Sequence, residues 1–377
     1  MAKKDDKDIV MYAAGDIGPD RADPVSIFRH VTGVLKQGDI TFVQLEVNLS
    51  DRGAGRKENA RNPRIAAAIK EAGFNVVSFA GNHCLDAGVD AFLDTIDNLN
   101  KQNLKVIGVG RNIAEARRPA IIETKGTRAV FLAYNSILHE GYWAEDNRPG
   151  CTPLRAWTLY EQIDPPQPGT PARIHTFPNR DDLAAMVQDI KQAKAQGDLV
   201  VVSMHCGIHF TPAVIAEYQR ELAHTAIDAG ADLVLQHHAH ILKGIEVYCG
   251  KVIFYSLCNF ALELRFMTKE RASSTSFKEM AQGLNPDWKP PYPDYPSFPF
   301  PPDSRKTLIA KCIISGKKIK RVSFLPAIIN QQAEPEILTS GDKRFSEIVK
   351  YMTDISRDQG IDTEYVVEGD EVVITNK

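Results

Sequence analysis

The stretch from Ala231 to His240 reads Ala-Asp-Leu-Val-Leu-Gln-His-His-Ala-His, and the rest of the chain is interpreted around it. Its apolar half, ending at Leu235, is typical of a short buried strand that follows a helix. Three imidazoles, His237, His238 and His240, therefore stand at the carboxyl end of a strand, where we expect them to converge on one small volume. Neutral imidazole is a common ligand of transition metals, and in an extended segment His238 and His240 would point the same way. We expect a metal site here; the alternative is a loop of solvated histidines.

The composition is that of an ordinary globular protein. The 377 residues are 43% hydrophobic, and the formal charge of -3 with an isoelectric point near 6.4 offers no basic surface for nucleic acid or an anionic membrane. No run approaches the roughly 18 apolar residues that a membrane helix needs. The charged amino terminus lacks the apolar core of a signal peptide. We therefore expect a cytoplasmic protein that binds neither nucleic acid nor membrane and keeps its scattered cysteines reduced.

Short apolar runs alternate with helical patterns along the chain, which indicates an α/β fold. The predicted strands are Ile9 to Ala14, Ile40 to Leu45, Phe74 to Phe79, Lys105 to Val109, Ile121 to Glu123, Ala129 to Tyr134, Leu199 to Met204, Ile245 to Tyr248, Val252 to Tyr255, two within Thr307 to Ser323, and Glu364 to Ile374. The predicted helices are Pro24 to Leu35, Pro63 to Ala72, Val89 to Leu99, Asp181 to Ala195, Pro212 to Ala229 and Arg344 to Arg357. With no internal repeat in view, residues 1–377 are predicted to form a single domain.

Two proline-rich stretches interrupt this alternation and are predicted to be insertions. Residues 138–180 show no clear period, which favours a loop over the surface or over the site. Residues 267–304 end in a segment dense in proline and aromatic side chains. Proline excludes that segment from helix and from central strand, and so many large aromatics argue against a disordered linker. We expect an ordered loop packed on the domain, or a lid near the site.

Polar side chains of metal-ligating type directly follow several predicted strands. They are Asp16, Glu46, Asn82, His205, His238 and His240. Because the carboxyl ends of parallel strands share one rim of an α/β fold, we expect these side chains to lie close together. Two carboxylates, an amide oxygen and imidazoles would hold two divalent ions, with one carboxylate bridging. Taken singly, Asp16 and Asn82 could instead be turn formers beside glycine.

Short motifs spread over residues 9–260 carry a family resemblance. They are Gly15-Asp16, Leu45-Glu46, Gly81-Asn82-His83 with Asp86 and Gly88, Gly108 to Asn112 with Glu115-Ala116, His205 with Gly207, Asp228 to Val234, His238-Ala239-His240, and Tyr255 to Phe260. In their order and spacing they resemble the calcineurin-like metallophosphatase superfamily, specifically its branch named for the bacterial capsule protein CapA of poly-γ-glutamate synthesis. The resemblance implies a four-layer α/β/β/α sandwich with inserted loops and a metal site between its two sheets.

The resemblance also implies a role for each of these residues. Asp16 and His240 would bind a first ion, Asn82, His205 and His238 a second, and Glu46 would bridge the two. The implied cofactors are two divalent ions, Mn, Zn or Fe. His83 would lie beside them and stabilise charge or donate a proton. His209 stands where the family commonly has a glutamate, which makes it, with His83 and Asp16, a candidate catalytic residue.

Some positions depart from the family pattern. Gln236 and Cys258 stand where glycine is usual, and Ala239 stands where proline is usual. Gly18 replaces the histidine that phosphatases carry two residues after the first aspartate. The first ion would therefore have fewer protein ligands, which counts against a phosphate substrate.

Together these features favour metal-assisted hydrolysis of an amide, lactone or ester in a small molecule or peptide that carries an anionic group. Four arginines in loops after the first two strands are candidate ligands for that group, although each alone could be a solvated surface residue. They are Arg21, Arg52, Arg56 and Arg61. Three alternatives remain open: a phosphoesterase, a metal-dependent epimerase that acidifies the α-proton at a peptide end, and a non-catalytic capsule-related protein.

Overall fold

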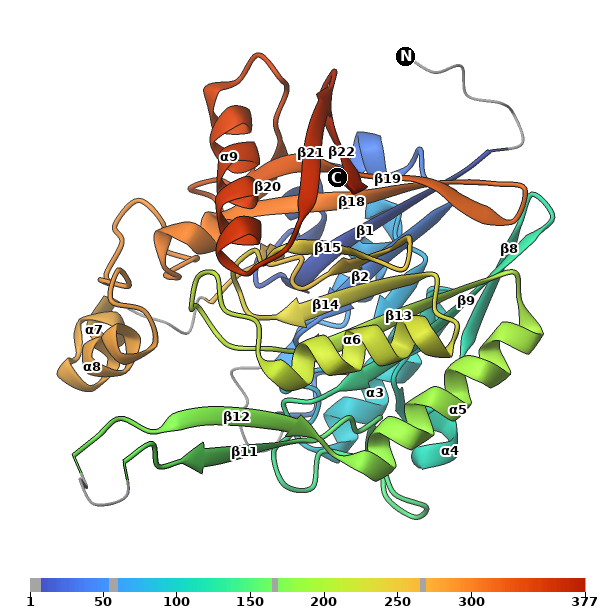
Figure 1. Cartoon of the computed structure of the whole chain (residues 1–377), viewed down its shortest axis with the longest axis horizontal. Helices are drawn as coiled ribbons and strands as arrows, with labels where there is room; N and C mark the ends of the chain where they lie inside the picture. The colour runs from blue at the N-terminus through green and yellow to red at the C-terminus, as the bar shows by residue number, and fades with distance from the viewer. Residues whose placement is uncertain (1–7, 54–59, 165–168, 265–268, 377) are drawn as a thin grey trace.

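Two β-sheets pack face to face between outer layers of helices in the computed structural model, which describes residues 8–53, 60–164, 169–264 and 269–376 (Figure 1). The first sheet runs in the order β21 (Thr363–Glu368), β22 (Glu371–Asn376), β19 (Lys318–Ile329), β18 (Lys306–Ser315), β1 (Ile9–Gly18), β2 (Ile40–Leu45), β5 (Val76–Ser78), β6 (Lys105–Ile107), with β17 (Asn259–Leu262) paired to β1 and β20 (Pro335–Ile337) to β19. Within it, β1, β2, β5 and β6 are parallel neighbours. Their carboxyl ends therefore share one rim.

The second sheet runs in the order β15 (Ile245–Tyr248), β16 (Lys251–Phe254), β14 (Leu233–His238), β13 (Leu199–Cys206), β9 (Thr127–Asn135), β8 (Ala120–Thr124). Its four central strands are parallel, and β8 and β15 are antiparallel edges. Outside the two large sheets lie three short pairs, β3 (Asn48–Leu49) with β4 (Ala60–Arg61), β7 (Val109–Gly110) with β10 (Gly150–Cys151), and β11 (Ala156–Glu161) with β12 (Arg173–Pro178).

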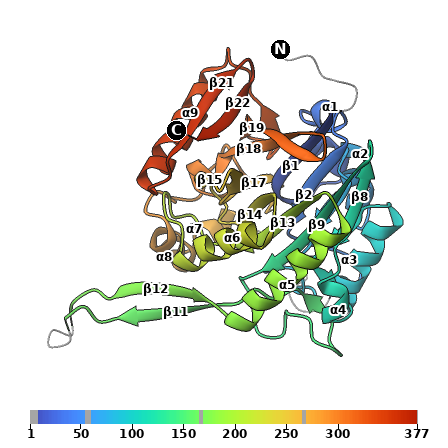
Figure 2. The same cartoon turned by 45° about the vertical axis from the view of Figure 1, so that its right-hand side comes forward.

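Side-chain alternation along the strands explains the layering. On β13, Val200 and Val202 pack in a core shared with α5 (Arg180–Gln196) and α6 (Glu217–Ala229), whereas Val201 packs in the core between the sheets. Phe42 of β2 stacks on Phe131 of β9 across that inner core, with ring centroids 6.4 Å apart. Figures 1 and 2 both show α5 and α6 lying over the second sheet.

Some of the remaining helices pack on the outer face of the first sheet. The described helices besides α5 and α6 are η1 (Pro24–Phe28), α1 (Thr32–Leu35), α2 (Ile65–Ala72), α3 (Val89–Lys101), α4 (Ile113–Ala116), α7 (Lys269–Ser273), α8 (Thr275–Leu284), η3 (Pro302–Arg305) and α9 (Lys343–Asp358). Phe92 of α3 stacks on Phe79 at 5.7 Å, and Phe28 meets Phe74 edge-on at 5.9 Å. The predicted four-layer α/β/β/α sandwich is confirmed. No helix in the described ranges combines the length and the apolar character needed to cross a bilayer.

Two predicted helices are shorter than expected. The segment from Pro24 to Leu35 is broken at Val31, whose φ of -122° leaves the helical region, so a 3-10 turn and one α turn replace a continuous helix. The segment from Pro212 becomes helical only at Glu217, because Ala213 adopts a positive φ of 50°. These residues form a loop instead, which continues from the pocket-lining residues His209 and Phe210.

The two insertions contain secondary structure that was not predicted from the sequence. Residues 138–180 include the hairpin β11–β12, which projects from the body in Figures 1 and 2. Its large apolar side chains, such as Trp157 and Tyr160, are exposed, so no core-facing period marks it. In residues 267–304, α8 carries an apolar stripe of Phe277, Met280, Ala281 and Leu284, spaced three or four residues apart, of which Ala281 is fully buried. The proline-rich part packs on the domain through Trp288, Phe298 and Phe300.

Candidate metal centre

Side chains from the carboxyl ends of strands in both sheets converge on one buried point. Asp16 lies in β1, Glu46 follows β2 directly, and His205 lies near the end of β13. Each offers one ligand atom, and these three atoms all lie within 4.8 Å of one another. The residues are 0%, 4% and 0% exposed. The parallel strands therefore bring together groups that lie far apart in the sequence, as the rim argument predicts.

Asp16 reaches this point because β1 is irregular there. The pairing register shifts beside Asp16 against both β2 and β17, and such irregularities redirect a side chain. The backbone at Gly15 passes so close to β17 that a Cβ would lie 1.9 Å from the carbonyl oxygen of Cys258. Glycine is therefore required before the aspartate. The Asp16 carboxylate accepts a hydrogen bond from the backbone N–H of His238 at 3.1 Å, which links the two sheets.

Glu46 presents its two oxygens to two groups of nitrogen and oxygen ligands. Its Oε1 lies 3.4 Å from Nε2 of His205, and that nitrogen lies 2.8 Å from Oδ1 of Asn82. Its Oε2 lies 3.8 Å from Nε2 of His240. Two ligand atoms at right angles around one ion at about 2.1 Å lie roughly 3 Å apart. The separations on the His205 side therefore approach those of atoms that share an ion.

The imidazole of His240 is oriented by a second side chain. Its Nδ1 lies 2.7 Å from Oδ1 of Asn259, so Nδ1 carries the proton and donates it. The lone pair is then on Nε2, which faces Glu46. A partner that fixes the tautomer in this way is typical of histidines that bind metals.

Buried polar atoms at the centre fit a cation. Within the described part of the chain, Asp16 Oδ1, Glu46 Oε1 and His238 Nδ1 are buried and make no hydrogen bond. Leaving such lone pairs unsatisfied costs free energy, and a positive ion satisfies carboxylates and imidazoles together. His238 and His240 also have positive φ values of 89° and 54°. Backbone strain of this kind gathers at functional sites.

The electrostatics of the cluster point the same way. Burial raises the pKa of Asp16 to about 8, although the bond from the His238 backbone opposes the shift. Burial, and then the charges of Asp16 and Asp86, raise the pKa of Glu46 well above its ordinary value. Burial lowers the pKa of His205 and of His238 well below the ordinary value. Without a cation, the two carboxyl groups keep their protons and the imidazoles are neutral. Metal binding would therefore have to remove protons only from the carboxyl groups, because neutral imidazole is already the form that binds a metal.

Metal uptake is therefore expected to release protons. The pKa of Asp16 in the folded chain, about 8, lies above its ordinary value of 3.8, so the metal-free protein holds this proton at neutral pH and loses it as the pH rises through about 8. A divalent ion must displace it, so apparent affinity should rise between about pH 6 and pH 8. Calorimetry at pH 7 in buffers of different ionisation enthalpy should show roughly one to two protons released per chain. Asp16→Asn should release fewer, and release of none by the wild type would contradict the assignment.

The histidine triplet does not act as one unit. His237 faces the interior: its ring stacks on Phe42 at 5.5 Å, and its Nδ1 lies 3.7 Å from Asp16 Oδ1. Neighbouring residues of a strand point to opposite sides, so His237 and His238 diverge. The expectation that three imidazoles converge on one small volume is corrected to two, His238 and His240, whose ring centroids lie 6.0 Å apart. The positive φ at His238 ends the extended segment that the sequence predicted.

His83 and His209 stand on either side of the ligand cluster. His83 Nδ1 lies 2.7 Å from Asp86 Oδ2, and its Nε2 lies 3.1 Å from Nδ2 of Asn82. The ring of His209 packs on that of His238 with centroids 3.8 Å apart. Burial lowers the pKa of His209 to about 4, so the ring is neutral at pH 7.

A substitution at His209 tests whether this ring takes part in function. His209→Ala should lower activity at least about tenfold, because it removes a neutral imidazole that touches a candidate ligand and lines the pocket described next. The matched control is His224→Ala, since His224 lies on α6 and bonds to Glu246 at 3.0 Å. Both variants should be assayed with the same substrate and metal. Equal, small losses would make His209 a structural residue.

A pocket of about 520 Å³ opens over the cluster. Glu46, Asn82, His83, His209 and His240 contribute to its lining. The ligand-type residues are therefore reachable from this cavity, although the side chains themselves are largely buried. Substrate could approach the cluster only through such an opening.

The four candidate arginines occupy different places. Arg61 lines the pocket, and its Nε lies 3.6 Å from Asp20 Oδ2. Arg21 instead forms ion pairs with Glu263 at 3.1 Å and Glu334 at 2.7 Å. Arg52 pairs with Asp94 on α3 at 2.6 Å. Neither of these two lines the pocket, and Arg56 lies outside the described residues.

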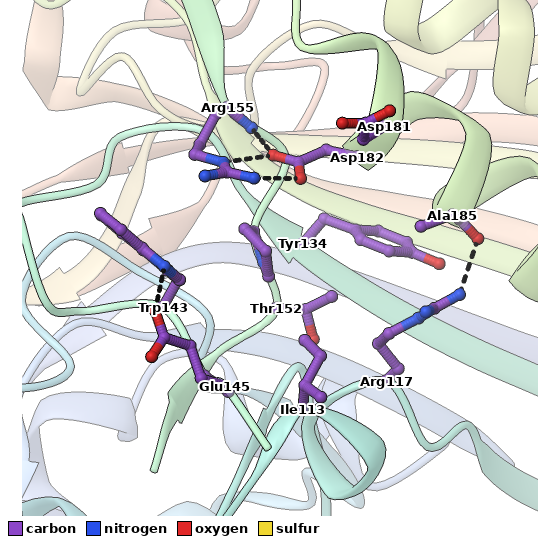
Figure 3. Close-up of a pocket in the computed structure, with 12 residues that line it drawn as sticks. Ile113, Arg117, Tyr134, Trp143, Glu145, Thr152, Arg155, Asp181, Asp182 and Ala185 are labelled. Atoms are coloured by element: carbon purple, nitrogen blue, oxygen red, sulfur yellow. Dashed lines mark hydrogen bonds and ion pairs between the residues drawn. The ribbon is translucent and has the colours of Figure 1, made fainter. Parts of the chain in front are cut away.

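A second pocket, of about 360 Å³, lies elsewhere and shares no lining residue with the first (Figure 3). Both of its arginines bind carboxylates of the protein itself. Arg155 donates to both oxygens of Asp182 at 2.8 Å, and Arg117 donates to Asp189 and to the carbonyl oxygen of Ala185. These pairs account for the polar character of the pocket, which contains none of the predicted site residues.

Sequence reasoning missed several residues that shape the centre. Asn259 orients His240, and Asp86 orients His83 while accepting a bond from Tyr142 at 2.8 Å. Asp86 and Asn259 did stand within the quoted motifs, yet no spacing rule showed what they would touch. Arg271, from the second insertion, lines the pocket without any motif around it.

Comparison with known proteins identifies the family. The model of the bacterial capsule synthesis protein PGA_cap matches residues 5–263, more than half of the chain. The chain belongs to the PGA_cap family. All the candidate ligands lie inside the matched range, as do both candidate catalytic histidines. The predicted CapA-like membership is confirmed.

Relatives within the PGA_cap family match over part of their length. The chain is 29% identical to the PGA biosynthesis protein CapA of Bacillus subtilis over 63% of this chain and 57% of that protein. It is 30% identical to the capsule biosynthesis protein CapA of Bacillus anthracis over 63% of this chain and 54% of that one. The chain thus spans just over half the length of these relatives. A solved calcineurin-like phosphoesterase, YfkN of Bacillus subtilis, is 12% identical with a TM-score of 0.38, covering 93% of this chain and 97% of that chain.

Proposed function

We propose that this PGA_cap-family chain is a metal-dependent hydrolase that holds two divalent ions, Mn, Zn or Fe, on either side of Glu46. The observation that carries the proposal is the position of that carboxylate. Its two oxygens face His205 and His240 separately, at 3.4 Å and 3.8 Å, at the floor of an open pocket. Asp16 with His240 would complete one site, and Asn82, His205 and His238 the other. A single structural ion would need neither the second group of ligands nor access from solvent.

Ions bound there would polarise a substrate oxygen and lower the pKa of a coordinated water toward about 7, which supplies a nucleophile at neutral pH. The chain's own groups set up the rest of the reaction. His83 lies in the pocket lining beside Asn82, with a carboxylate on its far nitrogen. Asp86 would stabilise the imidazolium form, so His83 is placed to give a proton to a leaving group. Tyr142 holds Asp86 in turn.

The substrate class follows from the pocket and from position 18. Arg61 in the pocket lining offers a guanidinium for a carboxylate next to the scissile bond. At Gly18 a Cβ would lie 2.7 Å from side-chain carbons of both Leu262 and Val47, so no histidine fits where phosphatases have one. We therefore favour an amide, lactone or ester of a carboxylate-bearing small molecule or peptide over a phosphate ester. An amide next to carboxylates agrees with the capsule and PGA names of the relatives.

The test is a substrate screen on metal-loaded protein. Protein reloaded with Mn²⁺, Zn²⁺ or Fe²⁺ after chelation should cleave members of an amide, lactone and ester set that carry a carboxylate. Activity should disappear with the metal and return with it. Faster turnover of phosphate esters would favour the phosphoesterase reading. Exchange of an α-proton with solvent deuterium, without bond cleavage, would favour an epimerase.

A further inference from the structure

One side of the pocket is a continuous apolar surface, which we call the aromatic wall. Its members are Phe210, Phe277, Met280, Trp288 and Phe300. Phe210 comes from the loop after β13, Phe277 and Met280 from α8, and the other two from the proline-rich segment. The second insertion thus builds most of a wall over a centre whose ligand-type residues come from the two large sheets and the loops that follow their strands. Aromatic and thioether side chains at a binding site favour contact with an apolar part of the ligand.

The aromatic wall is held rigidly. The ring of Phe210 lies 4.5 Å from that of Trp288 and 5.7 Å from that of Phe300. Trp288 donates its indole N–H to the carbonyl oxygen of Pro299 at 2.8 Å, and Asn285 donates to the carbonyl oxygen of Phe210 at 2.8 Å. These contacts fix the wall before any ligand binds, so its shape can select among ligands.

The aromatic wall reaches the reacting centre. The ring of His240 lies 5.1 Å from that of Phe300 and 5.5 Å from that of Phe210. At the other end, Met280 is 47% exposed. An apolar ligand group could therefore lie along the wall beside the scissile bond and remove the Met280 thioether from water, which is favourable.

Two positively charged side chains also line the pocket and favour a negatively charged group in the ligand. Arg61 and Arg271 both line the same pocket, and the side chain of Arg61 is 4% exposed. The Arg61 guanidinium pairs with Asp20, its Nε lying 3.6 Å from Asp20 Oδ2, and its planar fork of five N–H donors allows it to bind a ligand carboxylate as well. A chain of repeated carboxylates would have to lay its charges against the aromatic wall, where desolvation opposes them. The pocket suits a ligand with two different ends.

Building on the proposed hydrolase function, we propose that the pocket binds compounds in which an aromatic or bulky aliphatic group lies within a few bonds of a carboxylate. The arginines would take the carboxylate, the aromatic wall would take the apolar group, and the bond between them would lie over the metal ligands. The residues of the aromatic wall would determine specificity. Met280 is the best of them to substitute, because its side chain is half exposed and its replacement should disturb packing least.

The experiment compares two ketones that have no amide to cleave, 4-oxo-4-phenylbutanoate and 4-oxopentanoate, in which a phenyl group stands in place of a methyl group. Equilibrium binding to the metal-loaded full chain is measured by calorimetry. Burial of the phenyl ring should strengthen binding at least about tenfold. In Met280→Glu the preference should shrink to about threefold or less, because a charge then meets the ring. The control is Leu284→Glu on the same helix, since Leu284 is 39% exposed and does not line the pocket; it should keep the full preference.

Three outcomes of the binding experiment would contradict the proposed ligand class. Equal binding of the two probes, detectable binding of neither, or a preference that survives Met280→Glu would overturn the proposal. Thermal melting of both variants identifies any loss of folding, and Met280→Ala, which adds no charge, should then show an intermediate preference. Because binding is measured without turnover, the two proposals can fail separately. Ring preference without cleavage of any amide would remove the hydrolase alone, whereas cleavage without ring preference would remove the ligand assignment alone.

Discussion

Glu46→Gln is expected to abolish tight metal binding, whereas the wild type is expected to bind two ions. Among the described residues, Glu46 is the carboxylate whose oxygens face both His205 and His240, and a neutral amide is a poor bridge between two cations. Activity should fall at least about 10³-fold, because both the nucleophile and the charge stabilisation are lost. Metal content after desalting, measured together with rate on the same preparation, checks the prediction. His238→Ala, which removes a ligand of one site, should retain at most one ion.

Comparing the stability of the metal-free variant with that of the metal-free wild type distinguishes misfolding from loss of metal. Glu46 is buried with Oε1 unbonded, so replacing it by glutamine should leave the metal-free protein at least as stable as the metal-free wild type. His224→Ala serves as the surface control and should keep wild-type metal content. Retention of two tightly held ions by Glu46→Gln would refute the bridging role.

His83→Ala is expected to keep its metal and lose its rate. The ring contacts Asn82 and Asp86 and lines the pocket, yet it is not among the groups that face Glu46. An acid acts mainly in the transition state, so removing it should lower the rate by about 10² to 10⁴ without changing the ions bound. Metal content and turnover of one preparation provide the measurement.

Two outcomes would change the role of His83. Metal loss as complete as in His238→Ala would make it a ligand. Full rate with full metal would mean that the reaction needs no acid at this place, and a proton-transfer reaction on other residues would then gain ground. The catalytic rate of Asp86→Asn should lie between those of the wild type and His83→Ala, because this variant removes the negative charge beside the His83 ring but keeps the ring itself.

The layered fold was readable from the sequence because it depends on local apolar runs. The strand from Ile40 to Leu45 has the predicted bounds, and α9 differs from its prediction by one residue at each end. The projecting hairpin was not predicted, because its strands bury no apolar face against the core. The helix α8 was overlooked although Phe277, Met280, Ala281 and Leu284 follow a helical period, because the whole stretch was interpreted as a proline-rich insertion. Residues 212–216 followed a helical pattern, but a positive φ at Ala213 overrides it.

The candidate centre was partly readable for a similar reason. Strand ends predicted which ligands meet, while the partners that orient them depend on contacts across the fold, such as Asn259 with His240. The same limit applies to Arg21, whose partners Glu263 and Glu334 lie hundreds of residues away. Cys258 is instructive: the family usually has glycine there, and the backbone keeps a positive φ of 63° although a side chain is present.

The aromatic wall shows what a family resemblance leaves out. Trp288 and Phe300 lie beyond the matched residues 5–263, yet their side chains line the pocket with the ligand-type residues. The resemblance therefore located the candidate metal ligands but said nothing about the surface that would select the substrate. That surface became visible only when the second insertion was placed against Phe210.

Anomalous diffraction from crystals of the Mn²⁺-loaded protein tests the central claim most directly. The predicted result is two peaks on either side of Glu46, one touching Asp16 and His240, the other touching Asn82, His205 and His238. A folded protein whose maps show no peak at these residues, under conditions that saturate binding in solution, would contradict the account.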